Sequence, residues 1–137
     1  MKEILEGLID SANAYTEKSV RIIRQGKLTM AEWRLLQQII AGNNTQEKLS
    51  VATTLDISTL SRQLKRLLDK QMVDKVAIGV DKRQLVYSAN EEGVRVSRNL
   101  TKQLEELKTI IFERWTDEET RLLKILINRL NNSINRS

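Results

Sequence analysis

Apolar residues recur every three or four positions along most of the chain, a spacing that predicts a mainly helical fold. It indicates a first helix over residues 4–23, which ends shortly before a glycine. Thr29 starts a second helix, because Glu32 follows it at the third position and completes the pattern of a capping box. Gly42 is suited to end this helix, since glycine readily adopts the backbone conformation found after helices.

Two further helices are expected after short turns. Asn44 is the expected N-cap of a short third helix, and Asp56 and Ile57 form a tight connection into a fourth helix over residues 58–70. The apolar residues of this fourth helix share one face: Leu60, Leu64, Leu67 and Leu68. The opposite face holds hydroxyl and basic side chains: Ser58, Thr59, Arg62, Lys65 and Arg66. The pattern therefore predicts a helix-turn-helix.

The period changes after the fourth helix. Residues 73–78 (VDKVAI) and 84–88 (QLVYS) are rich in β-branched and aromatic residues, and the short stretch from Gly79 to Arg83 joins them. Two such runs with a short connection predict a β-hairpin. The expected fold is thus mostly α with a small β-hairpin, and a hairpin that directly follows a helix-turn-helix is the layout of a winged helix.

Two long helices are expected at the C-terminal end. One begins at Asn90 and runs to about Trp115, and the last begins with a further capping box, from Thr116 to Glu119. Both carry apolar rows, which consist of Leu100, Leu104, Leu107 and Ile111 in the first and Leu122, Leu123, Leu126, Ile127, Leu130 and Ile134 in the second. Together with the first helix they present more apolar surface than a small compact lobe would cover.

Composition argues against an enzyme. The chain has 137 residues, enough for one domain, and contains neither cysteine nor histidine. The commonest general base, the usual nucleophile–base pairs and the usual zinc ligands are therefore lacking. No glycine-rich phosphate loop appears either. We expect no catalytic residues, no cofactor and no metal site.

The net charge of +5 is unevenly distributed, with seven basic and three acidic residues between Ser58 and Arg83. Such a block suits a polyanion such as DNA, although a basic face can also serve solubility alone. No apolar run approaches the ~18 residues of a membrane span, and no signal peptide is visible. A cytoplasmic protein without a membrane anchor is expected.

The polar face of the fourth helix has the chemistry of nucleic-acid recognition. Ser58 and Thr59 are short, so the start of the helix can approach a phosphate or a base edge closely. Arg62 and Arg66 can place two N–H groups on guanine or on phosphate. The alternative is an ordinary solvated face, which every surface helix has. The hairpin after the helix favours recognition, because an arginine at its tip could enter a narrow minor groove.

Four short motifs between Leu28 and Gly93 carry a family resemblance. They are Arg66-Leu67-Leu68-Asp69-Lys70-Gln71, Met72-Val73-Asp74-Lys75, Asp81-Lys82-Arg83 and Ala89-Asn90-Glu91-Glu92-Gly93. Without a gap in spacing, they resemble the pattern of the multiple antibiotic resistance regulator (MarR) family of winged-helix transcription regulators. That pattern reads Arg-Leu-x-x-Lys-Gly, Leu/Trp-Val-x-Arg, Asp-x-Arg and Leu-Thr-x-x-Gly.

Three positions depart from the family pattern. Gln71 replaces a glycine that would tolerate a positive φ after the helix, so mild strain is expected there. Lys75 stands where arginine is usual, which keeps the charge but loses the planar fork. Ala89 and Asn90 replace Leu-Thr, and Asn90 remains a good N-cap for the next helix.

The resemblance implies a single domain over residues 1–137, with a winged-helix DNA-binding lobe over about 28–92. Residues 1–26 and 91–137 would then form a homodimer, which predicts a pseudo-palindromic operator. The implied contacts with double-stranded DNA are Ser58, Thr59, Arg62 and Arg66 in the major groove, Lys65 and Lys70 mostly on phosphate, and Arg83 in the minor groove. Asp81 would pair with Arg83 and direct it, and Lys82 would lie near phosphate.

Regulation is the least determined property. Family members commonly release DNA when a small aromatic or lipophilic ligand binds or when a cysteine is oxidised, and this chain has no cysteine. Four aromatic residues are candidates for a ligand pocket, although aromatics at helical spacing often belong to a core: Tyr15, Trp33, Phe112 and Trp115. The expected function is a dimeric, sequence-specific DNA-binding transcription regulator, a repressor. The alternative is a winged-helix interaction module whose basic face binds an acidic protein.

Overall fold

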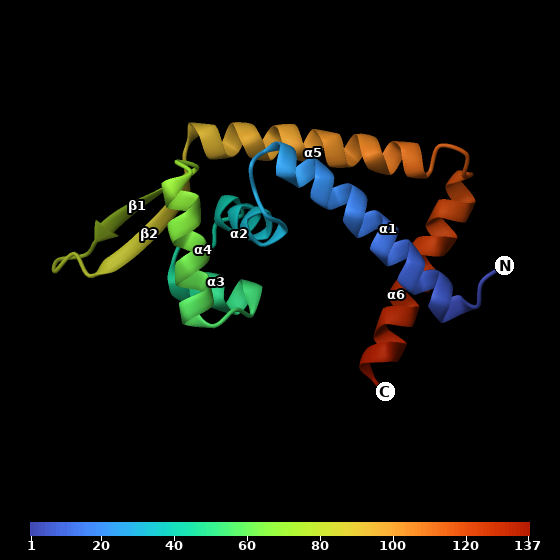
Figure 1. Ribbon diagram of the computed structural model, residues 1–137. Helices are drawn as coiled ribbons and strands as arrows, with labels where there is room; N and C mark the ends of the chain where they lie inside the picture. The colour runs from blue at the N-terminus through green and yellow to red at the C-terminus, as the bar shows by residue number, and fades with distance from the viewer. The chain divides into compact units, whose positions relative to one another are not determined.

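The computed structural model describes all residues from Met1 to Ser137 and contains helices and one two-stranded sheet (Figure 1). The elements are, in order, α1 (Ile4–Gln25), α2 (Met30–Ile40), α3 (Gln46–Thr53), α4 (Ile57–Asp69), β1 (Val73–Ile78), β2 (Gln84–Ala89), α5 (Glu91–Ile111) and α6 (Asp117–Asn135). The chain divides into two compact units, Met1–Gln103 and Leu104–Ser137, and α5 passes from one to the other. The expected fold class, mostly α with a hairpin directly after a helix-turn-helix, is confirmed.

The core of the first unit forms where α2, α3 and α4 meet. Each of these helices turns leucines inward, as the apolar spacing of α4 predicted for that helix. The fully buried leucines where these helices meet are Leu35 and Leu36 of α2, Leu49 of α3, and Leu60, Leu64 and Leu67 of α4. This core leaves the polar face of α4 outside.

The two capping boxes predicted at Thr29 and Thr116 are confirmed, since each threonine exchanges hydrogen bonds with the glutamate three residues later. The predicted cap of the third helix was wrong. Thr45 is the N-cap of α3, and its hydroxyl accepts from the Lys48 N–H at 3.2 Å. Asn44 lies one residue outside, and its carbonyl accepts from the Tyr87 N–H of β2 at 2.8 Å.

Two predicted helix ends also needed correction. α4 begins at Ile57 and not at Ser58, because Asp56 is its N-cap. α5 ends at Ile111 rather than near Trp115. Past this end the chain turns, with the Trp115 N–H donating to the Phe112 carbonyl at 3.0 Å. The two rings pack edge to face with centroids 5.1 Å apart.

The hairpin is attached firmly at its base and extends away from α2, α3 and α4 (Figure 1). β1 and β2 pair antiparallel from Val73 opposite Ala89 to Ile78 opposite Gln84. At the base, the Met72 carbonyl accepts from the Asn90 N–H at 3.1 Å. Asn90 caps α5 as predicted, since its Oδ1 accepts from the Gly93 N–H at 2.9 Å.

The outer helices of each unit leave apolar side chains in contact with solvent. On α1 these are Ile4, Leu5, Ile9 and Tyr15, and on α6 they are Leu122, Ile125, Leu126, Ile127 and Ile134. An amphipathic helix with an open apolar face normally has a partner. None of the helices has both the length and the apolar character to cross a membrane.

Candidate nucleic-acid interface

The first turn of α4 is organised by Asp56. Its Oδ1 accepts from the Thr59 N–H at 2.7 Å and from the Ser58 hydroxyl at 3.0 Å. These hydrogen bonds, the one from the Thr59 backbone above all, lower the pKa of the Asp56 carboxyl below its ordinary value. From the sequence, Asp56 was expected only as part of a connection, and this role was missed, although aspartate is among the preferred N-cap residues.

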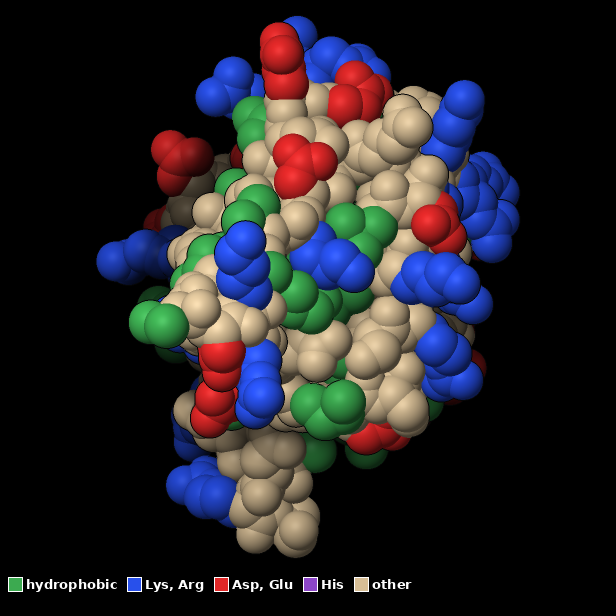
Figure 2. Space-filling view, turned by 90° about the vertical axis from the view of Figure 1, so that its left-hand side faces the viewer, with side chains coloured by type: hydrophobic (Ala, Val, Ile, Leu, Met, Phe, Trp, Pro, Cys, Tyr) green, Lys and Arg blue, Asp and Glu red, His purple; other side chains and the backbone are tan.

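The exposed face of α4 carries the side chains that the sequence selected. Ser58, Arg62, Lys65 and Arg66 are exposed, and Thr59 is partly exposed. Arg62 Nη2 donates to Thr59 Oγ1 at 3.2 Å, which holds the guanidinium close to the start of the helix. Lys65 and Arg66 form neither a hydrogen bond nor an ion pair within the chain, so their donors are available to a ligand. Figure 2 shows Lys and Arg side chains spread over the face of the molecule from which the hairpin projects.

The hairpin tip forms a tight turn at Gly79–Arg83. The Lys82 N–H donates to the Gly79 carbonyl at 3.2 Å, and both residues have positive φ angles, 96° at Gly79 and 54° at Lys82. Glycine adopts this conformation without strain, whereas lysine does so at a cost. The predicted pair of Asp81 and Arg83 forms at the tip, and the Lys82 side chain is exposed beside it.

Lys70 differs from the other predicted DNA contacts because its ammonium group is bound within the protein. Its Nζ donates to Glu32 Oε1 at 2.5 Å and to the Lys27 carbonyl at 2.8 Å. The sequence predicted a phosphate contact, but the structure turns this ammonium toward the protein. No local pattern could have revealed the pair, since its residues lie 38 positions apart.

Glu32 is a buried carboxylate, with a side chain only 1% exposed. Burial by itself would raise its pKa. Hydrogen bonds from Lys70 and the Thr29 backbone, with attraction to Lys70 and Arg66, outweigh burial and hold the pKa below the usual 4.5. Glu32 is therefore ionised in the folded protein near neutral pH.

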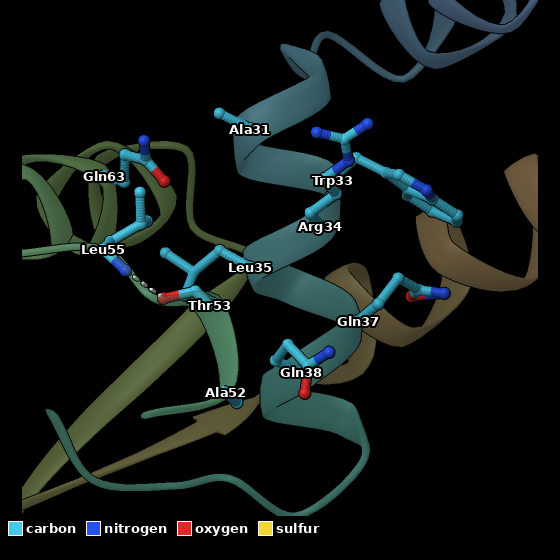
Figure 3. Close-up of a pocket in the computed structure, with 10 residues that line it drawn as sticks. All are labelled: Ala31, Trp33, Arg34, Leu35, Gln37, Gln38, Ala52, Thr53, Leu55 and Gln63. Carbon is cyan, nitrogen blue, oxygen red and sulfur yellow. Dashed lines mark hydrogen bonds between the residues drawn. The ribbon is translucent and has the colours of Figure 1, made fainter. Parts of the chain in front are cut away.

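The four candidate ligand aromatics lie in different settings. Tyr15 is exposed on α1, and Phe112 and Trp115 pack against each other in the second unit. Trp33 lines a surface pocket of about 370 Å³ formed by α2, α3 and α4. Gln63 of α4 also lines this pocket. Figure 3 shows that the Trp33 ring and the Gln63 side chain lie on opposite sides of α2. The structure holds no cluster of three acidic side chains that could bind a metal ion.

Comparisons with known proteins agree with this geometry. The sequence model of the MarR family matches residues 28–85. No curated protein sequence matches the chain. Among solved structures, a single-substitution variant of MepR from S. aureus is similar, with a TM-score of 0.85 and 16% identity over 97% of this chain and 99% of that one.

Two other structures have the same fold. E. coli MarR in its apo form gives a TM-score of 0.68 and 20% identity over 95% of this chain and 98% of its own. The transcriptional regulator SlyA gives 0.74 and 18% over 98% and 96%. The helix-turn-helix and hairpin of this chain, residues 28–85, therefore match the MarR family of winged-helix transcription regulators, and the fold shared with these structures extends over nearly the whole chain.

Proposed function

We propose that this protein binds a pseudo-palindromic operator as a homodimer and represses transcription from it. The main observation in support of DNA binding is that the first unit has two exposed basic surfaces: the outer face of α4 and the tip of the hairpin. Arg62, Lys65 and Arg66 are exposed on the first, and Arg83 on the second. A related structure, another S. aureus MepR variant, is bound to an oligodeoxyribonucleotide, and its TM-score of 0.72 supports this use of the fold.

In the proposed complex α4 enters the major groove. Ser58 and Thr59 at its start approach the DNA closely, while Arg62 and Arg66 reach base edges or phosphates. Lys65 contacts phosphate. The hairpin acts as the wing, and Arg83, directed by Asp81, enters the adjacent minor groove, where Lys82 lies near the backbone.

The exposed apolar faces of α1 and α6 support the homodimer. A second copy of the chain would cover Leu5 and Ile9 of α1 and Leu126 of α6, which are now exposed. Two-fold symmetry would then place two copies of α4 about one helical turn of DNA apart.

A small aromatic or lipophilic molecule is the proposed signal for release from DNA. Trp33 is the best placed of the four candidate aromatics, since it is among the residues that line the surface pocket formed by α2, α3 and α4. Thiol oxidation has no part in the proposal, because the chain lacks cysteine.

A salt titration tests the DNA-binding function. A duplex selected from a random pool by the protein is compared with a scrambled duplex of equal length and composition. We expect log K for both duplexes to fall steeply with log salt, because Lys and Arg side chains that bind phosphates release the counterions condensed on the DNA. The selected duplex should bind more tightly than the scrambled one by about 1,000-fold or more. Weak binding that hardly responds to salt would instead favour the acidic-protein partner.

A further inference from the structure

We propose that Lys70 and Glu32 set the orientation of α4 on the first unit, so that Lys70 is a positioning residue for DNA recognition and not a phosphate contact. The inference rests on the proposed DNA-binding function. It assigns a structural role to the buried carboxylate of Glu32, which is not among the proposed DNA contacts.

The contacts join three separate parts of the first unit. Lys70 is the C-cap of α4, immediately after the last helical residue. Its Nζ lies 2.5 Å from Glu32 Oε1 at the start of α2 and 2.8 Å from the carbonyl oxygen of Lys27 in the turn before α2. The same Glu32 oxygen accepts from the Thr29 N–H at 3.0 Å. One ammonium thus fastens the end of α4 to the first turn of α2.

Burial makes this contact a strong determinant of geometry. The Glu32 side chain is 1% exposed, whereas that of Lys70 is 35% exposed. A buried carboxylate without its cation is costly, so the fold favours the arrangement in which Lys70 stays bound. Two of the three N–H donors of the ammonium are already used inside the protein.

Because the contact lies at one end of α4, a small change there shifts the DNA-binding side chains at the other end. α4 contains 13 residues, and Ser58 and Thr59 lie at the end opposite Lys70. At 1.5 Å per residue the helix is roughly 20 Å long, so a tilt of about 5° at Lys70 moves its start by roughly 2 Å. Such a shift is enough to break a direct hydrogen bond to a base edge.

Lys65 provides a contrast on the same helix. Its side chain is exposed and has no partner within the chain, so its full charge is free for phosphate. Replacement of Lys70 and replacement of Lys65 are therefore expected to change DNA binding in different ways. Removal of a phosphate-binding cation lowers the salt slope of binding, whereas removal of a positioning residue lowers specific affinity and leaves the slope unchanged.

The experiment compares Lys70→Met with the matched control Lys65→Met, both as full chains. Methionine keeps an unbranched apolar stem and removes the charge. Affinities for the selected duplex and for the scrambled duplex are measured at several salt concentrations. Circular dichroism confirms that each variant is folded under these conditions, and affinities are corrected for the active fraction.

We expect Lys70→Met to lose roughly tenfold on the selected duplex, to lose little on the scrambled duplex, and to keep the wild-type salt slope. Lys65→Met should lose affinity for both duplexes, with a slope reduced by about 0.9 for each phosphate that is no longer neutralised. A similarly reduced slope for Lys70→Met overturns the inference in favour of a phosphate contact. An equal loss on both duplexes also overturns it, because it indicates general damage to the fold.

Glu32→Gln supplies a second variant that keeps an oxygen acceptor for the Thr29 N–H. We expect it to reduce specific affinity with an unchanged slope, and the double variant with Lys70→Met to lose less than the sum of the two. Additive losses would show that the residues act independently, against the inference. If the wild-type protein bound neither duplex, the proposed function itself would fail, which is a separate result.

Discussion

The Nε atom of Arg83 lies 3.4 Å from Oδ2 of Asp81, and the Arg83 N–H donates to Oδ1 of the same carboxylate at 3.3 Å. Asp81 therefore holds both the backbone and the side chain of Arg83. The side chains remain 62% and 87% exposed, so the pair contributes little to folding stability. Its value lies in restricting where the guanidinium points.

Replacing Arg83 tests whether the hairpin tip reads the groove. We expect Arg83→Ala to weaken binding of the selected duplex by about 1–3 kcal/mol, the range of one good arginine contact. Arg83→Lys, which keeps the charge but not the planar fork, should recover only part of the loss. Affinity is measured by fluorescence anisotropy at fixed salt. Unchanged affinity in Arg83→Ala would show that the tip does not contact DNA.

Gln71 departs from the glycine of the MarR family pattern and adopts a backbone conformation that is unfavourable for a residue with a side chain. Its φ is 59°, and the Gln71 and Met72 N–H groups donate to the Leu68 and Leu67 carbonyls in a Schellman motif. Glycine is favoured at such a position. We expect Gln71→Gly to stabilise the protein by about 1 kcal/mol in urea unfolding.

The control for this change is Lys65→Gly in the middle of α4, where glycine should destabilise by about 1 kcal/mol. A loss of stability in Gln71→Gly as well would mean that the Gln71 side chain makes a contribution larger than the backbone strain.

Gly93 is required by a close approach between backbones. A Cβ at this position would lie 2.1 Å from the Met72 carbonyl oxygen. Because the base of the hairpin cannot yield without separating from α5, we expect Gly93→Ala to destabilise by more than about 2 kcal/mol. Gly7→Ala is the control, since nothing lies within 4 Å of its added Cβ, and alanine favours helix. Equal unfolding midpoints for the two variants would contradict the expectation.

The buried carboxylate of Glu32 predicts a pH dependence. Its pKa is lower in the folded protein than its usual 4.5, so ionised Glu32 stabilises the fold above about pH 4.5. This contribution is lost as the pH falls through the lowered value. In urea unfolding, the stability advantage of wild type over Glu32→Gln should therefore shrink in acid. A difference that stays constant from neutral to acidic pH would refute the role assigned to Glu32.

The exposed face of α1 predicts a dimer that a single charge can weaken. Leu5 is 60% exposed, and burying an unpaired carboxylate at an interface is costly. We expect Leu5→Asp to raise the dimer dissociation constant by about tenfold or more in sedimentation equilibrium. Val51→Asp, at an exposed apolar residue of α3, should leave it unchanged. If Leu5→Asp also changed nothing, this part of α1 would lie outside the interface.

Local patterns in the sequence determined most of the secondary structure. The spacing of leucines gave α4 its buried stripe of Leu60, Leu64 and Leu67, and the change to β-branched residues located the hairpin. The capping boxes at Thr29 and Thr116 were visible because both partners lie within one turn of helix. The Asp81–Arg83 pair was expected from the resemblance to the MarR family pattern, and the structure forms it between residues that are close in sequence.

Only the tertiary structure decided which residues serve contacts distant in sequence. Asn44 is not the N-cap of α3, and its carbonyl accepts a hydrogen bond from Tyr87 of β2. Glycine is needed at position 93 because a Cβ there would clash with the Met72 carbonyl oxygen. Lys70, which reads as one more cation of α4, is turned inward by a carboxylate 38 residues earlier. A hydrogen bond depends on distance in space, so a linear pattern can supply a charged side chain but cannot say whether it faces solvent or a buried partner.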